Sequence, residues 1–354
     1  MACIAYLNKF SAPNALEILS AHGEHEVVRV DSDASLEKSF DIVSRAHAYQ
    51  CVGARDEVPA SLRVSTEFLS RAPNLLVASA SGSGVDVFDL EACTAAGVLV
   101  VNQAGANAQS VAEHALSMII SLYRYIGKSD LALRKGWSGS RWDFMGTDLA
   151  EKKIGIVGIG NIGTRLAQIC KNGFDCEVFA TDPNVNEEEI ARRGAKSVSF
   201  EKLLRHSDVI SVHTPLTDLT RNLFDADAFS QMKEGAVFIN AARGSIHSEE
   251  ALADALDAGH LAGAGLDVWD VEPPPASHRL LEGLNVVATP HIAGCTSHSL
   301  ENMAECAATQ LITIFSGQLA PRPVNPEVLP RFRERYLGFF GGDGLDELPT
   351  PKLL

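Results

Sequence analysis

Short apolar runs alternate with amphipathic stretches through the first hundred residues of the chain. Runs of Val, Ile, Leu and Ala predict buried strands, and apolar residues that recur every three to four positions predict helices between them. Alternation at this spacing is typical of a parallel sheet with helical crossovers. We expect strands at residues 4–7, 27–30, 48–52, 75–79 and 98–101, and helices at 13–22 and 86–96.

The same alternation restarts at residue 154 and predicts a second β/α unit. Between the two units, the spacing of apolar residues predicts one continuous helix over 110–128. In the loop that follows, Trp137 and Trp142 are expected mainly to pack in the core, with a subunit contact or a lid over the substrate pocket as the lesser alternatives. The tail 331–354 is assigned no regular structure. Further strands are expected at 154–157, 177–180, 209–212, 237–240, 263–266 and 286–288, and a last long helix at 300–315.

Composition and charge narrow the class of protein. The 354 residues are 46% hydrophobic and 21% charged, which is ordinary for a globular chain long enough for two domains. A net charge of -15 without a basic block argues against nucleic acid and anionic membranes as partners. No apolar run approaches the ~18 residues of a membrane span. The seven scattered cysteines include no C-x-x-C pair, which favours a reduced, cytoplasmic protein without zinc.

A glycine-rich turn near the middle of the chain predicts a dinucleotide site. An apolar strand runs into G-x-G-x-x-G, and an amphipathic helix follows. Gly158 permits the tight turn, Gly160 lets the backbone approach a pyrophosphate, and Gly163 lets the helix pack on the strand. Asn161 and Ile162 lie between the last two glycines, where the helix N-terminus offers unpaired N–H groups to phosphates.

An acidic residue follows the next predicted strand. Asp182 lies 19 positions past Gly163, where a carboxylate accepts hydrogen bonds from ribose hydroxyls and repels a 2′-phosphate. The expected cofactor is therefore NAD rather than NADP. The alternative interpretation is a turn-forming Asp before Pro183.

Three ionisable residues follow three other apolar strands: Arg243, Glu272 and His291. Ligands of open α/β sheets bind beyond the carboxyl ends of the strands, so these residues can converge. Together they supply a fixed cation, a carboxylate and a proton carrier, which suits acid–base chemistry on an anionic substrate. Any one of them alone is as well explained by a surface ion pair.

Several runs together resemble the NAD-dependent D-isomer-specific 2-hydroxyacid dehydrogenases, collinearly from about residue 75 to 325. These runs are VAEH at 111–114, the glycine turn at 158–163, HTPLT at 213–217, NAARG at 240–244, GLDV at 265–268, EP at 272–273 and TPHIAG at 289–294. The resemblance implies two Rossmann-like domains, the first flavodoxin-like, and a homodimer. The catalytic domain would comprise residues 1–103 and 293–330, the inserted NAD-binding Rossmann domain 104–292, and the C-terminal tail 331–354.

The resemblance also implies roles for individual residues. His291 would protonate the ketone oxygen of a 2-keto acid, Glu272 would hydrogen-bond His291, and Arg243 would bind the substrate carboxylate. The backbone N–H groups of Ser83 and Gly84 would face the substrate. The cofactor would also contact Thr214, Pro215, Ala241 and Asp267, with Asp267 beside the nicotinamide.

Departures from the family pattern bear on the substrate. Members that act on 3-phosphoglycerate carry Arg where this chain has Ala80, and a second Arg aligns roughly with Gly53, although Arg55 is close by. Formate dehydrogenases of this superfamily carry Gln in place of Glu272. The expected substrate is therefore a small unphosphorylated 2-keto acid, similar to glyoxylate or hydroxypyruvate or longer.

Two other functions remain open at this point. The C-terminal binding protein corepressors share the fold and the motifs, so an NAD-sensing binding protein is the main alternative. A hydrolase of the adenosylhomocysteine type would need Lys and Cys around the nicotinamide, and the sequence offers no such set.

Overall fold

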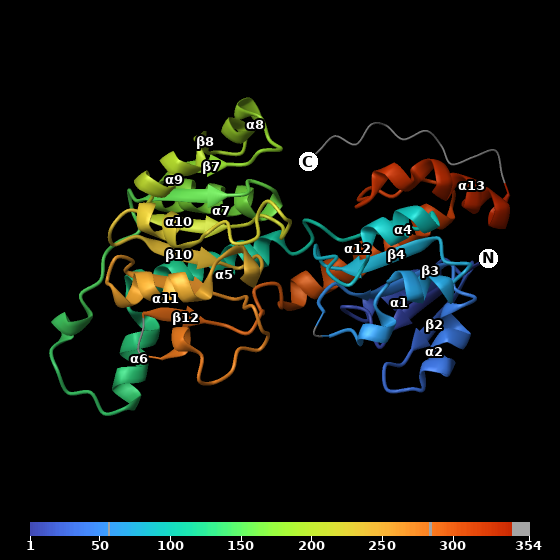
Figure 1. The fold of residues 1–354 in the computed structure, drawn as a ribbon, viewed down its shortest axis with the longest axis horizontal. Coiled ribbons are helices and arrows are strands. Elements are labelled where there is room, and N and C mark those ends of the chain that lie inside the picture. Colours follow the sequence, from blue (N-terminus) through green and yellow to red (C-terminus); the bar gives the residue numbers. More distant parts are fainter. Residues whose placement is uncertain (56, 283–284, 342–354) are drawn as a thin grey trace. The chain divides into compact units, whose positions relative to one another are not determined.

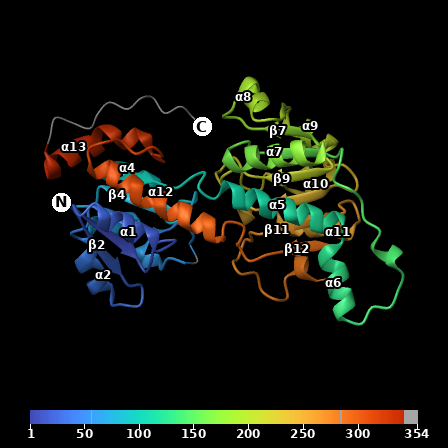
Figure 2. The same ribbon diagram turned by 180° about the vertical axis from the view of Figure 1, so that it is seen from behind.

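The computed structural model describes residues 1–55, 57–282 and 285–341, and the chain divides into two compact units (Figures 1 and 2). Unit 1 comprises Met1–Asn107 and the chain from Thr296 onward, and unit 2 comprises Ala108–Cys295. The domain boundaries expected from the sequence fall a few residues earlier, after residues 103 and 292.

Unit 1 contains a five-stranded sheet in the order β2-β1-β3-β4-β5. All of its strand pairs are parallel. This is the strand order of flavodoxin-like folds, as the resemblance implied. The strands are β1 (Ala2–Leu7), β2 (His25–Val30), β3 (Ala48–Val52), β4 (Val77–Ser81) and β5 (Leu99–Val101).

Helices cover both faces of this sheet, because alternate residues of each strand are apolar on both sides. On β1, Ala5 packs with Phe40 and Phe68 on one face, whereas Ile4 packs with Leu19 and Leu311 on the other. The first face carries α2 (Leu36–Val43), α3 (Thr66–Ser70) and α4 (Leu90–Ala96), with the short 3-10 turn η1 (Ala60–Leu62) nearby. The second face carries α1 (Asn14–Ala21), α12 (Ser297–Phe315) and α13 (Leu329–Phe340), and the 3-10 turn η5 (Pro326–Val328) leads into α13.

Helix α13 corrects the expectation that the tail has no regular structure. Phe332 and Tyr336 are buried in the same core as α12, and Phe340 packs against that core. Their four-residue spacing among charged residues is a helical signal, which the prolines before it obscured. Residues 342–354 of the expected tail lie outside the described residues.

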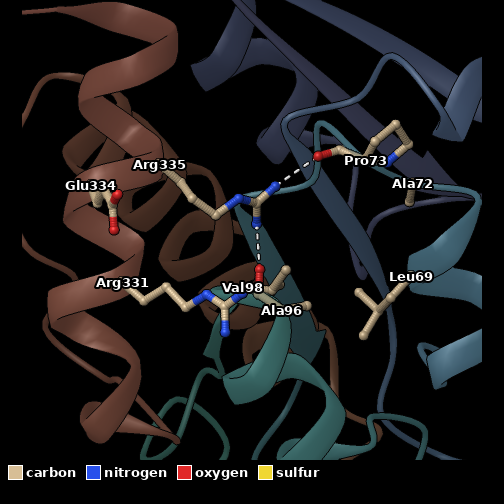
Figure 3. A pocket seen from close by; sticks show the side chains of 8 residues that line it. All are labelled: Leu69, Ala72, Pro73, Ala96, Val98, Arg331, Glu334 and Arg335. Carbon is tan, nitrogen blue, oxygen red and sulfur yellow. Dashed lines mark hydrogen bonds between the residues drawn. The ribbon is translucent and has the colours of Figure 1, made fainter.

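Arg335 ties α13 to the rest of unit 1 (Figure 3). Its guanidinium donates hydrogen bonds to the carbonyls of Leu75, Ala96 and Gly97 from one nitrogen and of Pro73 from the other, at 2.7–3.2 Å. Two of these carbonyls lie at the C-terminal end of α4, where carbonyls lack helical partners and the helix dipole favours a cation. The Arg335 side chain therefore supplies hydrogen-bond donors to these backbone carbonyls.

Unit 2 contains a seven-stranded sheet in the order β12-β11-β10-β9-β6-β7-β8. All of its strand pairs are parallel. Apart from the added β12, this is the strand order of dinucleotide-binding folds, and the direction of winding reverses between β6 and β9. The strands are β6 (Lys153–Val157), β7 (Glu177–Thr181), β8 (Lys196–Ser197), β9 (Val209–Val212), β10 (Val237–Asn240), β11 (Gly263–Leu266) and β12 (Val286–Ala288).

The expected single helix over 110–128 is two helices, α5 (Ala108–Tyr123) and α6 (Ile126–Arg134), separated by a left-handed Tyr125. Helix α5 buries one face against the sheet, but α6 buries no residue. The prediction was wrong because the apolar spacing continues past Tyr123, whereas none of the described residues of unit 2 buries a side chain of α6. The expectation that Trp142 packs in the core was also wrong, because this side chain is 65% exposed.

The segment from 124 to 146, here called the arm, is the part of unit 2 that departs from its main body after Tyr123 and rejoins it at Gly146. A side chain at Gly146 would lie 2.2 Å from the Tyr123 carbonyl, which also accepts a hydrogen bond from the Thr147 amide. The arm contains α6 and the 3-10 turn η2 (Arg141–Phe144) and lies at the rim of the unit (Figures 1 and 2).

The remaining helices pack on the two faces of the sheet. They are α7 (Asn161–Phe174), α8 (Glu187–Arg192), α9 (Phe200–His206), α10 (Ala226–Gln231) and α11 (Glu249–Asp257), with the 3-10 turns η3 (Gly244–Ile246) and η4 (Arg279–Leu281). Across the described parts of both units, no helix is long and apolar enough to span a membrane.

Replacing Arg335 tests its place in unit 1. Arg335→Ala leaves four backbone carbonyls without their donor. We expect the free energy of unfolding to fall by about 2 kcal/mol, because hydrogen bonds from a charged group are lost. Urea titration followed by circular dichroism measures it. The adjacent exposed Glu334→Ala is the control, and equal stability of the two variants would contradict the assignment.

Candidate active site

The glycine turn after β6 has the geometry that its sequence predicts. Gly158 has φ +90°, and a side chain there would lie 2.8 Å from the His213 carbonyl. A side chain at Gly163 would lie 2.2 Å from the Gly158 carbonyl, so α7 approaches the strand closely. Nothing lies within 4 Å of a side chain built at Gly160, and this backbone is therefore open to a ligand.

Helix α7 begins directly after this turn, with Asn161 and Ile162 as its first residues. The first N–H groups of a helix lack helical partners and attract anions. Open backbone at Gly160 and a 14-residue helix behind it therefore fit a pyrophosphate. Among the residues that the structure describes, no cluster of His, Cys, Asp and Glu could hold a metal ion.

Asp182 follows β7 and holds the glycine turn from the side. One carboxylate oxygen accepts a hydrogen bond from the Ile159 amide at 3.1 Å, and the other accepts one from the Asn184 amide at 3.0 Å. The Ile159 carbonyl is held at 2.7 Å by Arg193. Asp182 thus forms the local turn that was its alternative interpretation, and it does so beside the candidate phosphate site.

The other predicted cofactor residues follow neighbouring strands at the same sheet edge. Thr214 and Pro215 come after β9, and the Thr214 amide lies 2.9 Å from the side-chain position of Gly158. Ala241 comes directly after β10. The turn after β9 flanks the place where the winding of the sheet reverses, which is where dinucleotides bind in such folds, and β10 is the next strand along.

His291 and Glu272 meet as the sequence predicts. His291 Nδ1 and Glu272 Oε2 are 2.7 Å apart, and the side chains are 35% and 20% exposed. The second oxygen of Glu272 accepts a hydrogen bond from the Trp269 amide at 3.0 Å. Because Nδ1 is occupied, His291 can exchange a proton with a ligand only through Nε2.

The electrostatics of this pair favour a charged histidine. The hydrogen bond to Glu272 raises the pKa of His291 above its ordinary 6.5, although burial and the Arg243 charge act in the opposite direction. Burial raises the pKa of the Glu272 carboxyl, but the hydrogen bonds from His291 and Trp269 outweigh it and hold that pKa below its usual value. Both shifts therefore favour the imidazolium–carboxylate form of the pair.

Asp267 shapes the loop that carries His291. The carboxylate is fully buried and accepts hydrogen bonds from the Thr289 hydroxyl at 2.6 Å and from the Ile292 and Ala293 amides at 2.8 Å. These bonds enclose His291, whose backbone has a left-handed φ of +56°. The expected contact of Asp267 with the nicotinamide stays a prediction, since both of its oxygens are engaged by this loop.

Arg243 completes the group. Its positive charge lowers the pKa of both Glu272 and His291, so the three side chains share one electrostatic environment. The next residue must be glycine, because a side chain at Gly244 would lie 2.2 Å from the Trp269 backbone. The structure therefore brings together all three residues that the sequence singled out.

The predicted substrate loop lies in unit 1, directly after β4. Its backbone is held from β5 by Gln103, which accepts a hydrogen bond from the Gly82 amide at 3.0 Å, and by Asn102, which donates to the Ser83 carbonyl at 2.9 Å. A side chain at Gly53 would lie 2.2 Å from the Gly84 carbonyl. The role of Ser83 and Gly84 in substrate binding stays a prediction.

Comparison with known proteins agrees with this geometry. Residues 116–293 match the model of the "D-isomer specific 2-hydroxyacid dehydrogenase, NAD binding domain". A D-3-phosphoglycerate dehydrogenase of Archaeoglobus fulgidus is 37% identical over 84% of this chain and 56% of its own length. A glyoxylate/hydroxypyruvate reductase B of Escherichia coli is 34% identical over 86% of this chain and 92% of its own length.

A solved glyoxylate reductase from Paecilomyes thermophila superposes with a TM-score of 0.81 at 26% identity, covering 92% of this chain and 99% of that one. The fold predicted from the sequence is thereby confirmed. The chain spans about half the length of the phosphoglycerate dehydrogenases that it matches. The matched domain, the relatives and the fold together show that the chain belongs to the D-isomer-specific 2-hydroxyacid dehydrogenase family.

Proposed function

We propose that this protein is an NAD-dependent oxidoreductase that interconverts a small unphosphorylated 2-keto acid and the corresponding D-2-hydroxy acid. The observation that carries the proposal is the 2.7 Å contact between His291 and Glu272 within the electrostatic reach of Arg243. It supplies a proton donor with a raised pKa and a cation in the unit that carries the glycine turn.

Each residue has one task in the reaction. Bound NADH supplies the hydride. His291 delivers the proton from Nε2 to the ketone oxygen, because its other nitrogen is held by Glu272. Glu272 keeps the imidazole charged and oriented, and Arg243 binds the substrate carboxylate and polarises the carbonyl. In the oxidative direction the same His291 nitrogen accepts the proton.

Asp182 supports NAD as the preferred form of the cofactor. Its carboxylate stays partly exposed beside the glycine turn while one oxygen accepts the Ile159 amide. A carboxylate in this place repels a 2′-phosphate. A panel of keto acids run with NADH and NADPH side by side measures this preference together with the chain length of the substrate.

Unit 1 supports an unphosphorylated substrate, even though some relatives are named phosphoglycerate dehydrogenases. Ala80, where an Arg is expected for a phosphate, is fully buried. Gly53 has no room for a side chain against the Gly84 carbonyl. The nearby Arg55 guanidinium donates to the Asp86 carbonyl at 2.8 Å instead. We infer that a phosphate has no dedicated cations in this loop region.

The alternative of an NAD-sensing binding protein is not favoured by the site. A protein that only senses a dinucleotide needs the glycine turn and Asp182 but has no need of a hydrogen-bonded His291–Glu272 pair. Turnover of any 2-keto acid by the purified protein separates the two functions.

We further propose a homodimer in which the arm of residues 124–146 lies against a second copy. Five large apolar side chains of this arm are exposed by 52–71%. Apolar surface gathered on one segment marks a protein interface. They are Ile126, Leu131, Leu133, Trp142 and Met145. We propose a cytoplasmic location as well, which the seven free thiols support.

Removing the imidazole tests the proton-transfer role. We expect His291→Ala to lower kcat for keto-acid reduction by about 100- to 10,000-fold, the range for loss of a general acid. The dissociation constant of NADH, measured by fluorescence titration, should change by less than about twofold, because His291 is not one of the residues proposed to bind the cofactor. The exposed His206→Ala is the control, and unchanged kcat in His291→Ala would refute the role.

The pH dependence of reduction tests the pairing with Glu272. A raised pKa means that His291 stays protonated above pH 6.5, so kcat/KM is high at low pH and falls as pH passes that pKa. Glu272→Gln removes the negative partner, and we expect the falling limb to move to lower pH. The limb is read from kcat/KM between pH 5 and 9. A limb that stays in place would separate Glu272 from the acid.

A charge in the arm tests the dimer. We expect Trp142→Asp combined with Leu133→Asp to convert a dimer to a monomer in light scattering, because two charges would be buried without partners. The paired control Asp130→Ala and Arg134→Ala removes an exposed ion pair of the same helix and leaves the mass unchanged. A wild-type chain that is already monomeric would overturn the dimer.

A further inference from the structure

Asn240 is a fully buried amide at the end of β10, three positions before Arg243. Buried amides are costly unless their donors and acceptors are all used. Here Oδ1 accepts a hydrogen bond from the Ala242 amide at 2.9 Å, and Nδ2 donates to the Arg243 carbonyl at 2.8 Å. Nδ2 also lies 3.0 Å from Nδ1 of His247.

These partners fix the orientation of the amide. The Ala242 N–H can only donate and the Arg243 carbonyl can only accept, so the oxygen and nitrogen of Asn240 cannot exchange places. The second hydrogen of Nδ2 then points to His247, whose Nδ1 must accept it. Both Nδ2 hydrogens and the oxygen of Asn240 are thereby used by partners within the next seven residues.

His247 is built to be this acceptor. It is fully buried, and burial lowers the pKa of its imidazole to about 4, so the ring is neutral at pH 7. The ring packs against Phe238 of β10, with the ring centroids 5.5 Å apart and the planes tilted by 52°. Its proton is on Nε2, and that atom has no hydrogen-bond partner among the described residues. Within the described part of the chain, the Nε2–H group of His247 therefore stays without a hydrogen bond, while Nδ1 accepts the hydrogen bond from Asn240.

We propose that Asn240, supported by His247, is a positioning residue for Arg243, whose backbone it clamps from both sides of the turn. This inference rests on the proposed function, in which Arg243 binds the substrate carboxylate. Asn240 itself touches neither substrate nor cofactor in this scheme. Its whole effect on turnover passes through the placement of the Arg243 guanidinium.

The first arm of the test is a double-mutant cycle. We expect Asn240→Ala to lower kcat/KM for the keto acid by about 10- to 100-fold, because displacement of a binding group by about 1 Å has effects of this size. In an Arg243→Ala background the same change should cost less than about twofold, since the effects of residues that act as a unit do not add. An equal loss in both backgrounds would overturn the proposal.

The second arm needs no turnover. The groups that act on His291 are Glu272, Arg243 and Asp267, and of these only Arg243 lowers the pKa while the two carboxylates raise it. Displacing Arg243 should therefore raise the pKa of His291, and we expect Asn240→Ala to shift it in the same direction as Arg243→Ala. Titration of the His291 imidazole by NMR, assigned by its loss in His291→Ala, measures both shifts. An unmoved pKa in Asn240→Ala would refute the clamp.

Two further variants keep the result interpretable. His247→Phe keeps an aromatic ring but removes both ring nitrogens, of which only Nδ1 has a hydrogen-bond partner in the residues that the structure describes, Asn240, so we expect a smaller effect in the same direction. Ser207→Ala removes another buried side-chain hydrogen bond of unit 2, to the Leu203 carbonyl, and should leave kcat/KM and the His291 pKa unchanged. If the wild-type chain reduces no keto acid, the proposed function fails, and the NMR titration still decides whether Asn240 positions Arg243.

Discussion

The parallel direction of all seven strands in unit 2 is the constraint on which its chemistry depends. Parallel strands end at one edge, so the turns after β6, β7, β9, β10, β11 and β12 all open on the same side of the sheet. Residues separated by more than a hundred positions, from Gly158 to His291, reach one neighbourhood for this reason alone. Because backbone hydrogen bonds hold the strands in register, each group arrives at a fixed height along that edge.

The strand ends position these turns, but buried polar side chains give them their shape. Asn240 at the end of β10 and Asp267 just after β11 are both fully buried. The side chain of Asn240 accepts a hydrogen bond from the backbone of the Arg243 loop, and that of Asp267 accepts hydrogen bonds from the backbone of the His291 loop. A carboxylate suits the His291 loop, which offers only donors. An amide suits the Arg243 loop, which offers a donor and an acceptor. The choice between Asp and Asn therefore follows from the backbone that each has to satisfy.

Much of this arrangement could be predicted from the sequence, because it rests on local patterns. Apolar runs located β3, β9, β10, β11 and β12 at their observed residues, and the glycine spacing located the turn before α7. The hydrogen-bonding roles of Asn240, His247 and Thr289 could not be predicted from the sequence, because these bonds form only after folding. Helix α6 was misjudged for a related reason. Apolar residues at helical spacing indicate a helix face that is buried, but they do not show whether it is buried against the same chain or against another molecule.

Neighbouring charges act on the pKa of His291 in opposite directions. Glu272 acts through a direct hydrogen bond and raises the pKa of His291, whereas Arg243 acts through space and lowers it. The direct contact prevails, and the imidazolium coexists with a nearby cation. If Arg243 binds an anionic substrate as proposed, that anion would offset the cation, remove its opposing influence and raise the pKa of His291 further. By linkage, protonation of His291 would then tighten the binding of the anion by the same factor. In a chain of net charge -15, the proposed anion site would therefore depend on the local charges of Arg243 and protonated His291.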